Sequence, residues 1–533
     1  MHPHRCFKQQ TLHLEAMSLL PIERFCTCYN TLEDQSNLRR QGPEVVELLW
    51  CFWSDNQNVE SALRILFTTS SVDDTTDDPP FVASKKKLLI QNFEIYGWSP
   101  IRLRWSERKH ESSSRPVQSK MYSMSAAAYD LLQQYRIWKQ LHADLFHYRD
   151  SGDDITTDAD VVADSVLRFV PSESGLSGTN VAEAKVSWEY QRRSRTCPSP
   201  TDVKASNADI APTNLSSTKE KRNRLKFRLH AWTEILHTAI CHVMDELELP
   251  TEHLIVNYHD TSREATNKSK NISSHEPIDL LRAFRYDPVS TTTDSTDDDD
   301  DIKAQSIGSS PHTDWGSWTV VWQDDTHPPC LQTYCYHCQK WNGVQSPPLS
   351  ISNCDDYDTN NENAVNFIVH VGDITSLCIR HAIQHEQESE NRPSSHHTFS
   401  LGDAIPDTTS MWPSPRHRVI SPRGQYRHSL VYFVYPPPDT ATPASITECL
   451  YTWCRSHYGK SRLSVKNHQR IPYEDYSLLC DQSATTAATC DDETTKCAVA
   501  FTPNNDRHLR QWNHIKDVPV RQIFEEKWKQ VQR

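Results

Sequence analysis

The chain is short of apolar side chains for its length. Only 36% of its 533 residues are hydrophobic, and the mean hydropathy is -0.69. Globular domains usually hold about 45–50% apolar residues when glycine is included. A single compact body of this length would need a larger apolar fraction to fill its core. The composition therefore predicts one folded domain diluted by polar insertions.

Long hydrophobic runs and excess positive charge are also missing. No run approaches the ~18 apolar residues that a membrane helix needs, and Met1–Gln10 contains no apolar signal core. The net charge of -14 disfavours a nucleic-acid-binding protein, which would carry a basic footprint. We expect a cytoplasmic protein with no membrane and no nucleic-acid partner, while organelle targeting and the oligomeric state stay open.

The 16 cysteines are scattered without a repeating frame, which is typical of an intracellular protein with reduced thiols. One cluster holds residue types that zinc accepts. It consists of Cys330, Cys335, His337, Cys338 and Cys354. Because Cys335 and Cys338 are not joined by a second pair at matching spacing, ordinary thiols are favoured over a zinc site.

The sequence pattern divides the chain into four regions. They are a helical extension at 1–80, a helical and mixed part at 81–279, a β-rich domain at 280–440 and a helical tail at 441–533. Apolar residues at helical spacing predict several helices. These helices are expected at Pro43–Trp53, Val59–Phe67, Met121–Tyr148, Leu225–Leu249 and Val518–Val531.

Short β-rich runs dominate the third region. They are Leu281–Tyr286, Trp318–Trp322, Asn366–Val371, Arg418–Ile420 and Ser429–Tyr435. Polar insertions separate them, at Ser290–Asp301, Gln345–Glu362 and His381–Ser410. Several short strands joined by long loops predict an antiparallel sandwich or barrel.

Two His-x-Asp triplets occur in the chain, and one metal ion can be bound only if both side chains of a pair lie on one side. His142 and Asp144 stand in a predicted helix, where residues two apart point about 200° away from each other. His312 and Asp314 stand at the start of a predicted strand, Trp315–Trp322, where residues two apart share a face. Only the second pair can therefore chelate a metal.

A third ligand must come from a histidine farther along the chain. The candidates are His370, His381, His385, His396, His397 and His417. His417 is distinguished by Arg427 and Ser429 downstream of it. These two side chains face one way on a strand, and a guanidinium beside a hydroxyl is a receptor for a carboxylate. Two His and one carboxylate leave three positions of Fe(II) open, so the group predicts an iron site beside an anchor for a dicarboxylate.

At these residues the chain resembles the isopenicillin N synthase-like family of Fe(II)- and 2-oxoglutarate-dependent dioxygenases. Several segments look like the family's landmarks and follow one another in the same order. They include Pro311–Thr319 (H-T-D-x-G-x-x-T), Phe367–Asp373 (an apolar strand ending in Gly-Asp), Pro415–Val419 (the third ligand) and Arg427–Ser429 (R-x-S). The resemblance covers about Leu225–Pro438.

The resemblance implies an α+β fold, in which a double-stranded β-helix (jelly-roll) barrel carries flanking helices and long polar insertions. It also assigns roles to single residues. Iron is assigned to the catalytic centre His312, Asp314 and His417. The distal carboxylate of the co-substrate 2-oxoglutarate is assigned to Arg427 and Ser429, and Tyr286 adds a hydroxyl to the same ligand.

The implied reaction is oxidation of a small organic substrate by O2, as hydroxylation or desaturation, with release of succinate and CO2. Trp315 and Phe433 are candidate pocket walls, although core packing explains either residue alone. Two alternatives stay open. One is a non-catalytic jelly-roll binding or scaffold protein. The other is a non-haem iron oxidase that does not use 2-oxoglutarate, in which Arg427 and Ser429 hold a carboxylate of the substrate.

Overall fold

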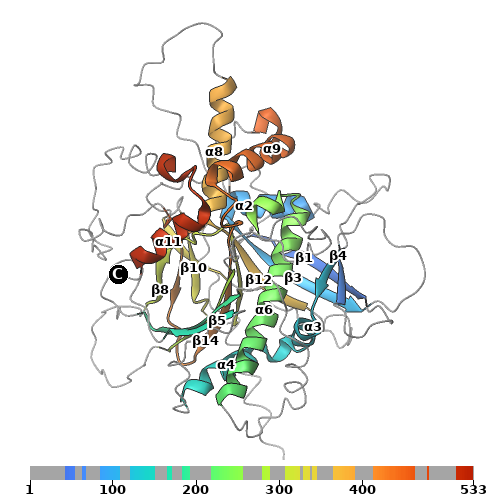
Figure 1. Ribbon diagram of the computed structural model, residues 1–533, viewed down its shortest axis with the longest axis vertical. Coiled ribbons are helices and arrows are strands. Elements are labelled where there is room, and N and C mark those ends of the chain that lie inside the picture. The colour runs from blue at the N-terminus through green and yellow to red at the C-terminus, as the bar shows by residue number, and fades with distance from the viewer. Residues whose placement is uncertain are drawn as a thin grey trace, which may run out of the picture.

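The structure is a computed structural model, and it describes part of the chain. The described residues are 43–53, 63–67, 85–107, 121–150, 165–170, 183–192, 218–255, 279–288, 307–324, 328–335, 339–344, 364–390, 412–462, 477–478 and 512–531. They form two β-sheets with helices packed around them (Figure 1). None of the described helices combines the length and the apolar character required to cross a membrane.

Ten strands form the large sheet, in the order β4-β2-β1-β3-β12-β9-β14-β7-β6-β5. They are β1 (Val46–Trp53), β2 (Leu63–Phe67), β3 (Trp98–Glu107), β4 (Met121–Met124), β5 (Ser165–Val170), β6 (Lys185–Arg192), β7 (Asp279–Tyr286), β9 (Trp318–Gln323), β12 (Ala364–Val371) and β14 (Arg427–Val434). β1 and β3 are parallel. From β3 through β12, β9, β14, β7 and β6 to β5 the neighbours are antiparallel.

Four short strands form the small sheet, in the order β11-β10-β13-β8. They are β8 (Ile307–His312), β10 (Leu331–Cys335), β11 (Lys340–Gly343) and β13 (His417–Ile420), and all are antiparallel. No hydrogen-bonded strand pair among the described residues joins the two sheets into a closed barrel.

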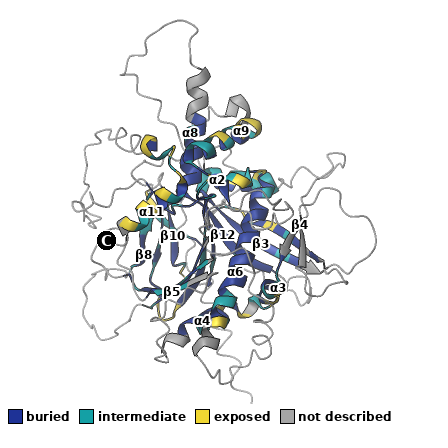
Figure 2. Ribbon diagram, in the orientation of Figure 1, coloured by how far each residue is buried: buried dark blue, intermediate teal, exposed yellow. Residues whose placement is uncertain are grey.

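Helices surround the sheets. They are α2 (Lys85–Tyr96), α3 (Ala126–Gln133), α4 (Trp138–Asp150), α6 (Thr218–Glu246), α7 (Thr251–Leu254), α8 (Asp373–Glu390), α9 (Pro443–Arg462) and α11 (Val520–Val531). The long green helix α6 crosses the large sheet and contacts β6 and β14 (Figure 1). It is buried along most of its length, whereas α9 and α11 carry exposed residues (Figure 2).

The two faces of the large sheet carry different hydrophobic cores. On β14, Leu430, Tyr432 and Val434 are buried in the larger core, which includes α6. The Tyr432 hydroxyl lies 2.9 Å from Nδ1 of His237 on that helix. Because successive strand residues point to opposite faces, Arg427 and Ser429 face the other way, toward the small sheet.

A smaller core fills the space between the two sheets. The large sheet contributes Trp98, Phe284, Tyr286, Val321 and Ile368, and the small sheet contributes Leu331 and Val419. Burial of such side chains contributes about 1.5–3 kcal/mol each. This core holds the small sheet against the inner face of the large one, so polar side chains at its edges lie in a protected space.

Some sequence predictions are confirmed and others are wrong. The helix predicted at Leu225–Leu249 is the greater part of α6, the one predicted at Val518–Val531 contains α11, and the five predicted strands correspond to β7, β9, β12, β13 and β14. The helices predicted at Pro43–Trp53 and Val59–Phe67 are wrong, because β1 and β2 occupy these segments. In β1 every second residue (Val46, Leu48, Trp50, Phe52) is buried, which is the period of a strand.

Two further predictions need correction. The helix predicted at Met121–Tyr148 is divided into β4, α3 and α4, because the Ser125 side chain accepts a hydrogen bond from the Ala128 backbone and begins a new helix there. The insertion predicted at His381–Ser410 begins inside α8, which continues to Glu390. The insertions Ser290–Asp301 and Gln345–Glu362 lie outside the described residues.

Candidate metal centre

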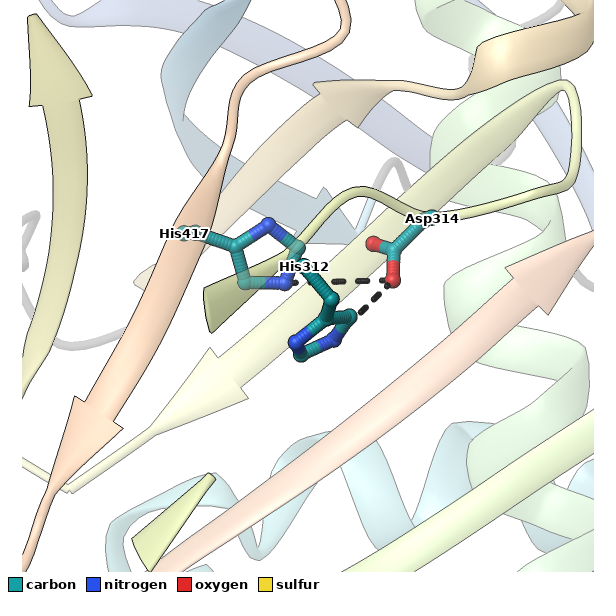
Figure 3. A group of neighbouring side chains, drawn as sticks. All are labelled: His312, Asp314 and His417. Carbon is teal, nitrogen blue, oxygen red and sulfur yellow. Dashed lines mark ion pairs between the residues drawn. The ribbon is translucent and has the colours of Figure 1, made fainter. Parts of the chain in front are cut away.

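His312, Asp314 and His417 come together at one edge of the small sheet. His312 is the last residue of β8 and is opposite His417, the first residue of β13. Asp314 lies in the connection from β8 to β9, so the prediction that His312 and Asp314 begin a strand is wrong in detail. The expected consequence still holds, because both side chains reach the same point (Figure 3).

The distances among the three side chains suit a single metal ion. Asp314 Oδ1 lies 3.7 Å from Nε2 of His312 and 3.8 Å from Nε2 of His417. One ligand atom from each residue lies within 4.8 Å of the other two. The described residues contain no second group of three His, Cys, Asp or Glu side chains with this property. Atoms bound to one ion at ~2.0–2.2 Å are spaced in this way.

Backbone carbonyls orient both imidazole rings. Nδ1 of His312 lies 2.6 Å from the Ser310 carbonyl oxygen, and Nδ1 of His417 lies 3.0 Å from the Pro415 carbonyl oxygen. A carbonyl only accepts, so each Nδ1 donates its proton and each Nε2 keeps a lone pair. Metal-binding histidines are commonly fixed in this way. The two lone pairs are available on the side where Asp314 lies.

The electrostatics also favour the metal-binding protonation states. Burial, and after it the neighbouring His417, lower the pKa of His312 to about 4. Burial alone would raise the pKa of Asp314, but His417, His312 and His370 outweigh it, so this pKa lies below its usual value. A neutral imidazole and an ionised carboxylate are the forms that bind metals. Oδ1 of Asp314 faces both Nε2 atoms, and its Oδ2 is buried with no hydrogen-bond partner among the described residues, so the carboxylate keeps lone pairs for a cation.

Two glycines let the connection Thr313–Ser317 between β8 and β9, named the metal-binding loop after the candidate ligand Asp314, approach its neighbours. A Cβ atom on Gly316 would lie 2.4 Å from the Val434 carbonyl oxygen, and one on Gly372 would lie 2.1 Å from the carbonyl oxygen of Gly316. The Asp373 backbone amide donates to the Asp314 carbonyl at 2.7 Å. The backbone that carries Asp314 is therefore held between the ends of β12 and β14.

The predicted carboxylate anchor lies on the inner face of the large sheet. Arg427 is 1% exposed, and its Nη2 donates to Oε1 of Gln323 at 2.5 Å. Its Nε and Nη1 atoms have no hydrogen-bond partner in the described part of the chain, and neither has Oγ of the buried Ser429. The guanidinium lies 4.7 Å from the ring centre of Tyr286, its partner on β7. Burying a cation without a carboxylate partner costs free energy, and an anionic ligand that binds the guanidinium would offset that cost.

The other histidines considered as third ligands are not part of the group formed by His312, Asp314 and His417, or they lie outside the residues that the structure describes. His370 is buried beside His417, with ring centres 5.1 Å apart, but it is not part of the metal-binding group. His381 stacks on Trp512 at 4.3 Å. His396 and His397 lie outside the described residues, and the side chain of His385 is not described. Gln323 and the placement of His370 were missed because nothing in their local sequence distinguishes them.

The cysteine cluster, the two candidate pocket walls and His142 are not part of the group of three side chains that could hold a metal. Cys330 and Cys335 are buried, while His337, Cys338 and Cys354 lie outside the described residues. Trp315 and Phe433 are partly buried and pack against the larger core. The Trp315 ring also lies 5.4 Å from that of Trp528 on α11. His142 is buried in α4 on the other face of the sheet, where its Nε2 lies 2.9 Å from the Ser429 carbonyl oxygen.

Comparison with known proteins gives matches only among solved structures. No protein-family model and no curated protein matches the chain. A putative oxygenase from Shewanella oneidensis is 15% identical, covers 71% of this chain and 96% of its own, and has a TM-score of 0.33. The dioxygenase for auxin oxidation of rice is 13% identical, covers 66% and 77%, and has a TM-score of 0.32.

A third match is a full-length Neurospora crassa protein in complex with alpha-KG. It is 14% identical, covers 72% of this chain and 87% of its own, and has a TM-score of 0.35. These TM-scores are too low to establish a shared fold or activity. The functional conclusion below therefore depends on the side chains of this protein.

Proposed function

We propose that the protein is an Fe(II)- and 2-oxoglutarate-dependent dioxygenase that oxidises a small organic substrate and releases succinate and CO2. One observation carries the proposal. A group of two imidazoles and one carboxylate, placed to share one metal ion, lies on the inner side of the fold together with a buried guanidinium that has no carboxylate partner among the described residues. Either feature alone would suit several kinds of protein, but together they match a ligand with one chelating end and one anionic end.

The strand order supports the jelly-roll expected for the region 280–440. In the large sheet four neighbours follow the order β12-β9-β14-β7, and the small sheet follows β11-β10-β13-β8. Along the chain the strands from β7 to β14 therefore pass repeatedly between the two sheets, except at the β10-β11 hairpin. This alternation is the connectivity by which two facing antiparallel sheets wind into a jelly roll.

The proposed roles of the residues follow from their chemistry. His312, Asp314 and His417 would hold Fe(II), which supplies the means to activate O2 and a 2-oxo acid. Arg427 and Ser429 would bind the distal carboxylate, and Tyr286 would close the space beside the guanidinium. Because these groups are buried, apart from the half-buried His312, they would orient the co-substrate and exclude water from the reacting atoms.

Two other functions would use the same residues differently. In an iron oxidase Arg427 and Ser429 would hold a carboxylate of the substrate, and 2-oxoglutarate would not bind. In a scaffold protein the three side chains would bind no metal. The oriented Nε2 atoms of His312 and His417 favour a metal-binding enzyme over a scaffold, and the unpartnered Nε and Nη1 of Arg427 beside Oγ of Ser429 in the described part of the chain favour a ligand with a second carboxylate.

The deciding experiment is an anaerobic titration of the purified full-length protein with Fe(II) and 2-oxoglutarate. A weak visible charge-transfer band would report the chelate. We expect the band in the wild type, its loss in His312→Ala, and a rise in the Kd for 2-oxoglutarate of about 10-fold or more in Arg427→Gln, since a charged hydrogen bond is worth about 1.5–3 kcal/mol.

Matched controls separate these effects from a general loss of structure. His253→Ala changes a histidine of α7, and Arg285→Gln changes the arginine that precedes Tyr286 and points to the opposite face of β7. Both controls should keep the band and the wild-type Kd. Iron binding without a band would favour the oxidase, and failure of the wild type to bind iron would contradict both enzymatic functions.

A further inference from the structure

His370 occupies a polar position on the inner face of the large sheet, next to the metal centre. It lies on β12 and pairs with Thr319 on β9, which in turn pairs with Phe433 on β14. Cross-strand partners share a face, so these three side chains form a row across neighbouring strands. Phe433 lies on the same face of β14 as Ser429 and Arg427. The row and the carboxylate anchor therefore belong to one inner surface.

The imidazole of His370 is buried and has unused hydrogen-bonding capacity. Its side chain is only 1% exposed, and neither Nδ1 nor Nε2 has a hydrogen-bond partner among the described residues. Leaving a polar group buried and unpaired costs about 1–3 kcal/mol. An imidazole carries at least one N–H donor in any protonation state. The position therefore calls for an acceptor that the described part of the chain does not supply.

The residues around His370 indicate that an acceptor for its N–H group would lie beside the candidate metal centre. Its ring centre is 5.1 Å from that of His417, at an interplanar angle of 60°. It also interacts electrostatically with Asp314 and, more weakly, with His312. His370 is nevertheless outside the group of three side chains that can share one ion. It therefore lies where it can contact a molecule bound to the metal without being a ligand itself.

A chelating 2-oxo acid presents an acceptor of this kind. Its C1 carboxylate gives one oxygen to the metal, and the other oxygen carries part of the negative charge into the pocket. In the proposed function the distal carboxylate at the other end of the molecule would be bound by Arg427 and Ser429, whose polar atoms Nε, Nη1 and Oγ have no partner among the described residues. A buried carboxylate oxygen needs a donor, and Arg427 cannot serve both ends at once.

We propose that His370 donates a hydrogen bond to the oxygen of the C1 carboxylate that does not bind the metal. This inference rests on the proposed function and adds a second carboxylate-binding residue to it. The 2-oxo acid would then be held at both ends, by Arg427 at the distal carboxylate and by His370 at the chelating carboxylate. His370 would act on binding and orientation of the co-substrate, whereas metal affinity would depend on the triad.

Oxalate separates the two ends, because it chelates a metal through its carboxylates and has no distal arm. The experiment measures the Kd of oxalate and of 2-oxoglutarate by calorimetry on full-length protein loaded with Mn(II), a metal that suits oxygen and imidazole ligands. The variants are His370→Phe, which keeps a ring without donors, His370→Asn, which keeps a donor, and Arg427→Gln. His237→Phe is the control, since it removes a buried histidine of α6 on the other face of the sheet.

We expect His370→Phe to weaken oxalate and 2-oxoglutarate alike, by about 10-fold for a hydrogen bond to a charged group. His370→Asn should recover part of this loss. Arg427→Gln should weaken 2-oxoglutarate and leave oxalate within about 2-fold, and His237→Phe should leave both within about 2-fold.

Two results would overturn the inference. The first is an oxalate Kd in His370→Phe within about 2-fold of the wild type at equal Mn(II) affinity; this would leave the proposed function standing. The second is a loss of oxalate binding in His370→Phe that His370→Asn does not relieve and that Mn(II) binding shares, which would make the residue merely structural. A wild type that binds Mn(II) but neither acid would instead refute the proposed function, and the role of His370 with it.

Discussion

Thr313, which stands between the candidate ligands His312 and Asp314, exchanges two hydrogen bonds with Ser477, 164 positions farther along the chain. The Thr313 backbone amide donates to Oγ of Ser477 at 3.0 Å, and the Ser477 amide donates to Oγ1 of Thr313 at 2.8 Å. Leu478 continues the contact, because its amide donates to Oδ2 of Asp373 at 2.8 Å. Since Asp373 also accepts from the Thr313 hydroxyl, a remote segment holds the backbone of the metal-binding loop.

Removing this contact should loosen the metal centre. We expect Ser477→Ala to weaken Mn(II) binding by about 2- to 10-fold, because one hydrogen bond contributes about 0.5–1.5 kcal/mol and the Thr313 amide would lose its partner. Hydrogen exchange of peptides that contain Thr313 should become faster in the absence of metal. Ser456→Ala is the control, since its hydroxyl donates within α9. Unchanged exchange at Thr313 would show that the contact does not support the loop.

The close backbone approach at Gly316 should make this position intolerant of any side chain. A Cβ there would lie 2.4 Å from the Val434 carbonyl, and backbone yields less readily than the end of a side chain. We expect Gly316→Ala to lower the free energy of unfolding by about 1–3 kcal/mol and to weaken Mn(II) binding. Gly424→Ala provides the contrast, because nothing lies within 4 Å of its Cβ and only its φ of +70° opposes the change.

Denaturant unfolding and Mn(II) titration of the two glycine variants would test this difference. In Gly424→Ala the free energy of unfolding should fall by about 1–2 kcal/mol, because alanine disfavours the left-handed backbone conformation at this position. The variant should bind Mn(II) as the wild type does. If Gly316→Ala kept wild-type stability and metal affinity, the approach of the β8–β9 connection to β14 would not be a requirement for the site.

The buried His142 predicts a specific dependence of stability on pH. Burial, and after it His428, lower the pKa of His142 to about 4, although the hydrogen bond to the Ser429 carbonyl raises it in part. In the unfolded chain the same residue binds a proton near pH 6.5. The stabilisation is therefore present in full above about pH 6.5 and is lost as the pH falls toward 4, since the unfolded state then binds more protons.

The test compares unfolding free energies from pH 7.5 to 4.5 for the wild type and His142→Phe. The variant should be less stable at neutral pH, because it removes the hydrogen bond between the His142 side chain and the Ser429 carbonyl, but its stability should fall less steeply below about pH 6.5. Over this pH range the wild type should lose at most a few kcal/mol more of its free energy of unfolding than His142→Phe loses. His253→Phe should follow the wild type, and parallel curves for His142→Phe and the wild type would contradict the assignment.

Local sequence was sufficient to nominate His312 and Asp314, which the structure brings together with His417, and to nominate Arg427 and Ser429 on one face of β14. His312 and Asp314 are two residues apart, and Arg427 and Ser429 share one strand, so their relationships do not depend on the rest of the fold. His370 and Ser477 could not be assigned in this way, since their neighbours come from other strands or from a segment far along the chain. The apolar run Val46–Trp53 was predicted to be helical because eight residues rich in apolar side chains satisfy both periods.

Gln323 offers the sharpest test of the carboxylate anchor, because its Oε1 accepts the hydrogen bond from Nη2 of Arg427 while its Nε2 donates to the Val344 carbonyl at 3.2 Å. Gln323→Leu removes the support of the guanidinium and should raise the Kd of 2-oxoglutarate by about 3- to 10-fold. Gln323→Glu places a carboxylate beside Arg427 and should raise it further, because the new ion pair competes with the ligand. Oxalate, which does not reach Arg427, should bind both variants as it binds the wild type. Equal 2-oxoglutarate affinities in Gln323→Glu and the wild type would mean that Arg427 does not bind the distal carboxylate, whatever the metal centre does.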